Sequence, residues 1–174
     1  MYLGHVGVAL GAKGVRPRIA LLALLIAAYA PDWVDSGLCI VGAYDPRGML
    51  SHSFPAMAVL VALAIAAYAS NTRDYTSALV VGGVVVSHML LDWITGYKPT
   101  WPGGPMIGLR LYGQPAQNLI VEGLVIGMGV MLYMRSLPPR TRGWIDVGLM
   151  FAALMAMQAG IIVVRAITVS LPKC

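Results

Sequence analysis

Residues 77–95 read SALVVGGVVVSHMLLDWIT, an apolar run that contains two ionisable side chains, His88 and Asp92. Four residues separate the two, so a helix presents both on one face. Ionisable groups at membrane depth cost about 2.5–3.5 kcal/mol each on the insertion scale, and they are usually paired, bound to a ligand or turned toward a polar cavity. The run therefore predicts a membrane-spanning helix whose His88 and Asp92 meet a polar or metallic group.

The composition of the whole chain indicates a membrane protein. Of its 174 residues, 59% are hydrophobic and only 11% are charged, far from the usage of soluble domains. Apolar stretches alternate with loops that carry turn signals and charge, which predicts four full spans and one short one. These stretches are 19–30, 54–69, 78–94, 119–134 and 147–171. We expect an all-α fold, a polytopic integral membrane helical bundle, in a single transmembrane domain over residues 1–174.

The amino-terminal segment is too short to be a span. We expect residues 2–12 to form a half-helix that packs against residues 19–31 in a short hairpin. At 1.5 Å per residue the second arm reaches only about 20 Å into a hydrocarbon core of about 30 Å. Asp32, at the end of that arm, is then left inside the membrane slab.

Basic residues predict the orientation. One set of loops holds Lys13, Arg16, Arg18, Arg73, Arg135, Arg140 and Arg142, and the other holds Arg47, Lys98, Arg110 and Lys173. The positive-inside rule puts the first set in the cytoplasm, which predicts a multi-pass protein of the plasma or inner membrane with lipid as its partner. The net charge of +5 follows largely from this topology and needs no nucleic acid. The sequence leaves open whether Cys39 and Cys174 pair and whether the chain forms a homo-oligomer.

Several groups that bind metals are predicted to lie toward the same face of the membrane. Zinc takes imidazole nitrogen and carboxylate oxygen in sites of three or four protein ligands. The residues that satisfy this requirement are Asp32, His52, His88 and Asp92. His5 with a shared Asp92 would begin a second position, with Asp35 or Glu122 as spare carboxylates, and two bridged ions suit phosphate-ester hydrolysis.

Each of these residues also has a structural interpretation. His88 and Asp92 could hydrogen-bond each other across one turn, and Asp32 could simply end a helix. His5 could be a packed histidine, and Glu122 could cap the start of its own helix, where the dipole favours it. The convergence of the groups favours a shared ion, because one ion satisfies them together.

The order of short motifs resembles a known family. The motifs are Gly4-His5, Pro31-Asp32, Arg47-Gly48, Ser51-His52-Ser53, Ser87-His88 with Asp92, Trp101-Pro102 and Glu122. Over roughly residues 1–125 this order resembles the membrane-bound metal-dependent hydrolases, a family that includes a LexA-regulated bacterial inner-membrane protein. Pro46 stands where that family usually has a histidine. The resemblance implies a metal-dependent hydrolase.

The ligand order also resembles the first part of the zinc-dependent phospholipase C and single-strand nuclease fold. That resemblance implies one ion on Asp32, His52, His88 and Asp92, and a second on His5 and Asp92. The histidines that complete a third zinc in that fold have no counterpart after Asp92.

These observations predict a membrane-embedded hydrolase with one or two zinc-type ions near the outer leaflet, acting on a phosphate ester of a lipid or head group. Asp32 or Glu122 would accept a proton from metal-bound water. Three cations, Arg47, Lys98 and Arg110, are candidate phosphate clamps, although each also reads as an ordinary loop charge. A transporter or metal-handling protein is the alternative, since intramembrane His and Asp also mark ion pathways. A structural protein that packs through the glycines of residues 123–127 would not need the histidines.

Overall fold

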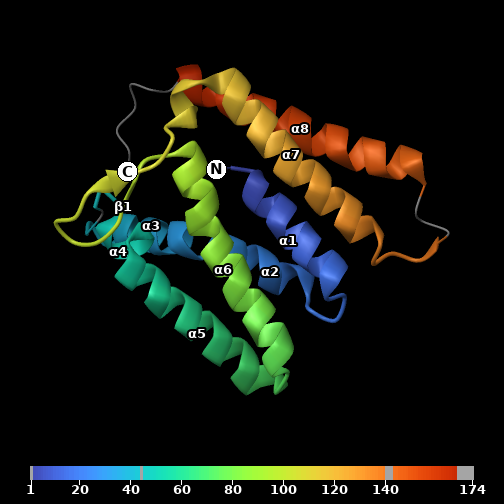
Figure 1. Ribbon diagram of the computed structural model, residues 1–174, viewed down its shortest axis with the longest axis horizontal. Coiled ribbons are helices and arrows are strands. Elements are labelled where there is room, and N and C mark those ends of the chain that lie inside the picture. The colour runs from blue at the N-terminus through green and yellow to red at the C-terminus, as the bar shows by residue number, and fades with distance from the viewer. Residues whose placement is uncertain (1, 44, 140–142, 168–174) are drawn as a thin grey trace.

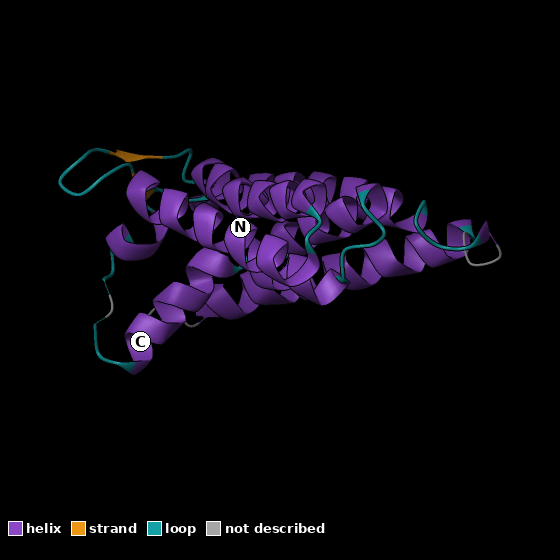
Figure 2. Ribbon diagram, turned by 90° about the horizontal axis from the view of Figure 1, so that it is seen from below, coloured by secondary structure: helices purple, strands orange, loops and turns teal. Residues whose placement is uncertain are grey.

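A computed structural model describes residues 2–43, 45–139 and 143–167. The elements in chain order are α1 (Gly4–Val15), α2 (Leu21–Ala28), α3 (Ala30–Ile40), α4 (Met49–His52), α5 (Phe54–Thr72), α6 (Tyr75–Thr95), β1 (Lys98–Pro99), β2 (Met106–Ile107), η1 (Leu111–Gly113), α7 (Pro115–Met134) and α8 (Trp144–Ile167). Figure 1 shows these helices as a bundle, and Figure 2 shows the short strands at one end of it. The prediction of an all-α polytopic membrane bundle is confirmed.

Four helices are long and apolar enough to cross a membrane, namely α5, α6, α7 and α8. The pair α2 and α3 passes the same test as a fifth span that is bent by 63°. Large apolar side chains remain exposed along these helices, among them Leu63 of α5 and Leu149 of α8. Lipid is the solvent that such surfaces require, so the predicted number of spans agrees with the structure.

The bend between α2 and α3 corrects one expectation. Asp32 does not end a span, because the chain resumes as α3, whose second residue is Pro31. Proline is tolerated in the first turn of a helix, where its missing N–H would have no intrahelical partner. The bend at Tyr29 thus places Asp32 in the first turn of α3 rather than at the end of a span.

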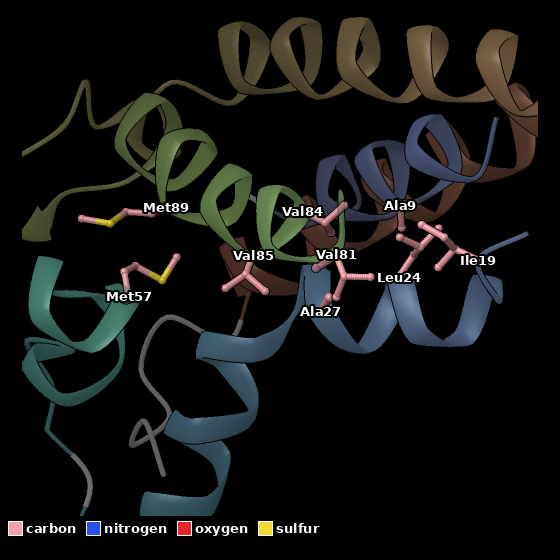
Figure 3. Close-up of a cluster of buried hydrophobic side chains, with 10 residues drawn as sticks. Ala9, Ile19, Leu24, Ala27, Met57, Val81, Val84, Val85 and Met89 are labelled. Carbon is pink, nitrogen blue, oxygen red and sulfur yellow. The ribbon is translucent and has the colours of Figure 1, made fainter. Parts of the chain in front are cut away.

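Helix α6 is the centre of the bundle. Of its most apolar 18-residue stretch 56% is buried, against 6% in α5 and in α8. Val81, Val84 and Val85 of α6 pack in one buried cluster with Ala9 of α1 and Leu24 of α2 (Figure 3). One face of the half of α6 that precedes His88 therefore lies in an apolar core.

Helix α1 is the predicted half-helix, and it packs on two neighbours. Ala9 meets Ile19 and Leu24 in the apolar cluster, which confirms the hairpin with α2. The opposite face of α1 lies against α7 through glycines, a contact that the sequence analysis did not predict. A Cβ on Gly7 would lie 2.8 Å from the Cα atom of Ile126, so the two helices meet backbone to backbone. Close approach of this kind is how small residues drive helix packing in membranes.

Two loops of the first basic set, the α1–α2 loop and the α5–α6 turn, lie toward the same end of α6 (Figure 1). Asp74, just before α6, accepts hydrogen bonds from the backbone N–H and the hydroxyl of Ser77. These bonds, together with the charges of Arg16 and Arg18, hold the pKa of Asp74 below its usual range. The α1–α2 loop and the α5–α6 turn are therefore neighbours, as a shared side of the membrane requires. Helices α3 and α4 and the strands lie toward the other end.

Candidate metal centre

Four side chains from three helices bring ligand atoms close together. The Nε2 atoms of His52 and His88 are 3.2 Å apart. Oδ1 of Asp32 lies 3.6 Å from the first nitrogen and 3.7 Å from the second. Oδ2 of Asp92 lies 3.5 Å and 3.7 Å from the same two nitrogens. Zinc–ligand bonds of about 2.0–2.2 Å put the corners of a tetrahedron about 3.3–3.6 Å apart, and these five separations lie close to that range.

The ligands come from separate elements that the fold brings together. His88 and Asp92 lie one turn apart near the end of α6, Asp32 lies in the first turn of α3, and His52 ends α4. All are almost fully buried except Asp32, of which 45% of the side-chain surface is exposed. The set is therefore reached from the side of Asp32.

The RG motif builds the turn that delivers His52. The carboxylate of Asp45 accepts hydrogen bonds from the backbone N–H groups of Arg47 and Met49. Gly48 has a φ of 71°, and a Cβ there would lie 3.3 Å from Nδ1 of His52. Glycine is favoured at such a left-handed position. The hydroxyl of Ser53 then accepts from the N–H of Ala56 and so ends α4 and begins α5.

Hydrogen bonds on the outer ring nitrogens fix the tautomers of both histidines. Nδ1 of His88 lies 2.7 Å from the carbonyl oxygen of Ala28, which can only accept, so Nδ1 carries the proton. Nδ1 of His52 lies 2.7 Å from the Ser51 hydroxyl and 3.4 Å from Oδ2 of Asp35. The Ser51 hydroxyl donates to the Gly48 carbonyl, which leaves its oxygen to accept from His52. In these tautomers both Nε2 atoms present lone pairs toward each other, an arrangement that suits a cation between them.

His5 adds an unsatisfied group to this cluster. Its ring is fully buried and stacks on that of His88, with centroids 4.0 Å apart. Nε2 of His5 lies 3.4 Å from Oδ1 of Asp92, yet within the described part of the chain neither ring nitrogen has a hydrogen-bond partner. A buried polar atom without a partner costs about 1–3 kcal/mol. His5, His88 and Asp92 thus form a second possible metal group, in which Asp92 turns its other oxygen toward His5.

The three predicted phosphate clamps are separated by the structure. Nζ of Lys98, on β1, lies 3.0 Å from Oδ2 of Asp92. The guanidinium of Arg110 instead lies 3.8 Å above the ring of Tyr97. Arg47 is exposed in the turn before α4. Only Lys98 is shown at the centre, and no sequence signal connected it to Asp92.

Glu122 has a contact that the sequence analysis missed. It lies two turns inside α7, so the interpretation as a cap of its own helix is wrong. Its two carboxylate oxygens accept hydrogen bonds from the N–H groups of Tyr2 and Gly4, at 2.8 and 2.7 Å. Oε1 of Gln158, on α8, accepts from the N–H of Leu3 between them. Glu122 thus caps α1 and holds the segment that carries His5.

The match to a family agrees with this architecture. A family model described as YdjM inner membrane protein matches residues 2–166. The chain belongs to this family. Neither curated proteins nor solved structures gave a match.

Membership of the YdjM inner membrane protein family, together with the apolar helices, establishes a multi-pass inner membrane protein in a lipid environment. The predicted membrane protein family is confirmed, whereas metal-dependent hydrolysis stays a prediction. The question of a disulfide between Cys39 and Cys174 falls outside the described residues, because Cys174 is not among them. A homo-oligomer also stays a prediction.

Proposed function

We propose that this YdjM family member is a membrane-embedded, zinc-dependent hydrolase of phosphate esters of lipids or their head groups. The observation that carries the proposal is the convergence of ligand atoms on Asp32, His52, His88 and Asp92, in which each carboxylate oxygen lies 3.5–3.7 Å from the Nε2 atoms of both histidines. The unsatisfied nitrogens of His5 support a second position that shares Asp92. Imidazole and carboxylate donors are the ligand types of catalytic zinc.

The residues divide the work of the reaction. When bound, zinc lowers the pKa of a coordinated water toward about 7 and polarises the attacked phosphoryl oxygen. Asp32 is the exposed ligand, so substrate approaches from its side, and its carboxylate can take the proton of the water. The cation of Lys98 orients the phosphoryl group beside Asp92. Asp35 and the Ala28 carbonyl keep the rings of His52 and His88 in the tautomers that leave Nε2 free to bind.

The alternative of a transporter finds less support in the packing of α6. Val81, Val84 and Val85 lie one to two turns before His88 and are buried in the apolar cluster. An ion path would have to continue through this part of the bundle with polar groups. A ligand set whose exposed member is Asp32, next to a buried apolar cluster, suits hydrolysis better than conduction.

Replacement of Asp92 tests the proposal. Asp92→Asn keeps the shape of the side chain but removes the charge, and His88→Ala removes a ring nitrogen. Ser87→Ala is the matched control, because the Ser87 hydroxyl bonds only the Val84 carbonyl of its own helix among the contacts described. Purified proteins are loaded with zinc and compared for metal content, melting temperature and turnover on a panel of lipid phosphomonoesters and phosphodiesters.

We expect wild type and Ser87→Ala to bind one to two zinc ions and to turn over substrate. Asp92→Asn should lose bound zinc and turnover together. The loss should exceed the roughly 10–100-fold fall in metal affinity or activity that follows removal of a group that only hydrogen-bonds a ligand. Its melting temperature should change little, since a buried carboxylate without metal is itself costly. Wild-type protein that stays folded but binds no zinc, or full turnover in a metal-depleted variant, would overturn the proposal.

A further inference from the structure

An apolar groove of about 430 Å³ lies between α1, α6 and α7. Its size falls within the roughly 300–1,000 Å³ range of ligand pockets. The α1 side is formed by Gly7, Val8 and Ala12, and the α7 side includes Val125 and Met128. Every one of these side chains is apolar or absent.

The groove follows from the glycine contact between α1 and α7, which lie next to each other in Figure 1. Gly7 and Gly129 let the two backbones touch, so this part of the groove has no side chains to fill it. The walls stay open to the membrane, since 66% of Met128 and 63% of Val15 are exposed. A depression of this kind at membrane depth is filled by hydrocarbon, because no water is available there to solvate it.

One end of the groove is lined by neighbours in sequence of the candidate ligands. Leu91, which lines the groove, lies on α6 between His88 and Asp92. On α1, Val8 follows His5 by three residues, a rise of about 4.5 Å along the helix. From this end the groove runs along α1 as far as Val15 and along α7 as far as Leu132. The groove is thus apolar along its length, and it starts one helical turn from His5 and beside the turn of α6 that carries His88 and Asp92.

We propose that this groove holds an acyl chain of the lipid whose phosphate reaches the metal centre. The inference rests on the proposed function and narrows its substrate class to long-chain lipid phosphates, as opposed to soluble phosphate esters. The apolar walls bind the tail, and Lys98 beside Asp92 receives the anionic head. Binding of the tail therefore positions the phosphate. Binding energy from a remote part of a substrate contributes in this way to orientation of the reacting group.

Filling the groove tests this assignment. Ala12→Phe blocks the α1 wall, and Met128→Trp blocks the α7 wall at an exposed position where packing is not strained. Ala66→Phe, on the exposed surface of α5 and away from the groove, is the matched control. Two esters with the same phosphate head group are compared, one with long acyl chains and one short enough to be water-soluble.

We expect the ratio of long-chain to short-chain turnover to fall at least about tenfold in both groove variants, on the scale that a methylene-sized misfit produces in an apolar pocket. Ala66→Phe should leave the ratio unchanged. An unchanged ratio in folded Ala12→Phe and Met128→Trp would overturn the assignment.

Binding is measured separately from hydrolysis. A phosphatidic acid with a diazirine in its acyl chain is photolysed with the protein in lipid nanodiscs, and labelled peptides are identified by mass spectrometry. Labelled peptides enriched on α1 and α7, with the enrichment lost in Ala12→Phe and retained in Ala66→Phe, would support the groove as an acyl site. If the same protein showed no hydrolysis, the proposed function would be wrong and the acyl site would stand. Uniform labelling of α5, α7 and α8 would overturn the groove as an acyl site. Crosslinks between two copies of the chain through this face would do the same.

Discussion

The contact between Glu122 and the start of α1 predicts a defined loss of stability in Glu122→Gln. The carboxylate accepts two backbone N–H groups, and an amide can accept only with its single oxygen. One charge-assisted hydrogen bond contributes about 1.5–3 kcal/mol, and an unpaired buried N–H costs about 1–3 kcal/mol. We therefore expect a destabilisation of about 3 kcal/mol, or a melting temperature lower by roughly 6–12 °C for a chain of this size.

The same variant should lose zinc affinity, although Glu122 is not a proposed ligand. Gly4 is bonded to Glu122 and precedes His5, so a shifted α1 moves His5 away from Asp92. Melting temperature in detergent and zinc content are measured on one preparation, with Gln117→Glu on the exposed side of α7 as the control. Unchanged melting temperature and metal content with a large loss of turnover would refute this reasoning. Glu122 would then act as the proton acceptor that the sequence analysis considered.

Three further predictions concern packing, capping and topology. Gly7→Ala should lower the melting temperature, because the new Cβ would lie 2.8 Å from the Cα atom of Ile126. Gly83→Ala should instead stabilise its helix by up to about 1 kcal/mol, because a Cβ there meets nothing within 4 Å. Asp74→Ala should lower the melting temperature at pH 7. Because the folded pKa of Asp74 is depressed, its contribution should begin to fall as the pH drops below about 4 and should shrink further as the pH falls through the lower folded pKa, so the difference from wild type narrows in acid. In a cysteine-free background, a cysteine at Ser136 should be labelled only from the cytoplasm and one at Gly104 only from outside, and the reverse result would move the centre to the inner leaflet.

The spans were predictable because bilayer thickness sets the length of an apolar run. The predicted stretches lie within or overlap the long helices of the structure, with ends shifted by a few residues. Helix α3 is not predicted by the sequence analysis, which ends the second arm of the hairpin at Pro31. Proline in the first turn of a helix breaks no hydrogen bond, so the chain can continue as a helix there. The glycines of α1 recur at helical spacing, but the helix that they meet is a property of the whole fold and not of the local sequence.

The core of the candidate centre was also predictable, because ionisable groups in apolar helices are usually paired, bound to a ligand or turned toward a polar cavity. The structure brings His5, Asp32, His52, His88 and Asp92 together, as expected. The groups that support them were not predictable, since the Ala28 carbonyl is a backbone atom and Lys98 reaches Asp92 only through the fold of the β1–β2 segment. Glu122 was misjudged for the same reason, as its partners are backbone N–H groups 118 and 120 residues away.

The anchoring of α1 has a consequence for biosynthesis. Leu3 is bonded to Gln158, 155 residues later in the chain. At translation rates of about 5–20 residues per second, α1 exists for roughly 8–30 s before its partners on α7 and α8 leave the ribosome. A 12-residue helix is too short to span the bilayer, so α1 depends on contacts with other helices for its place in the membrane. The order of synthesis thus leaves the start of α1 without its partners on α7 and α8 until late in translation, so the group of His5, His88 and Asp92 is held in place by helices that are made after it.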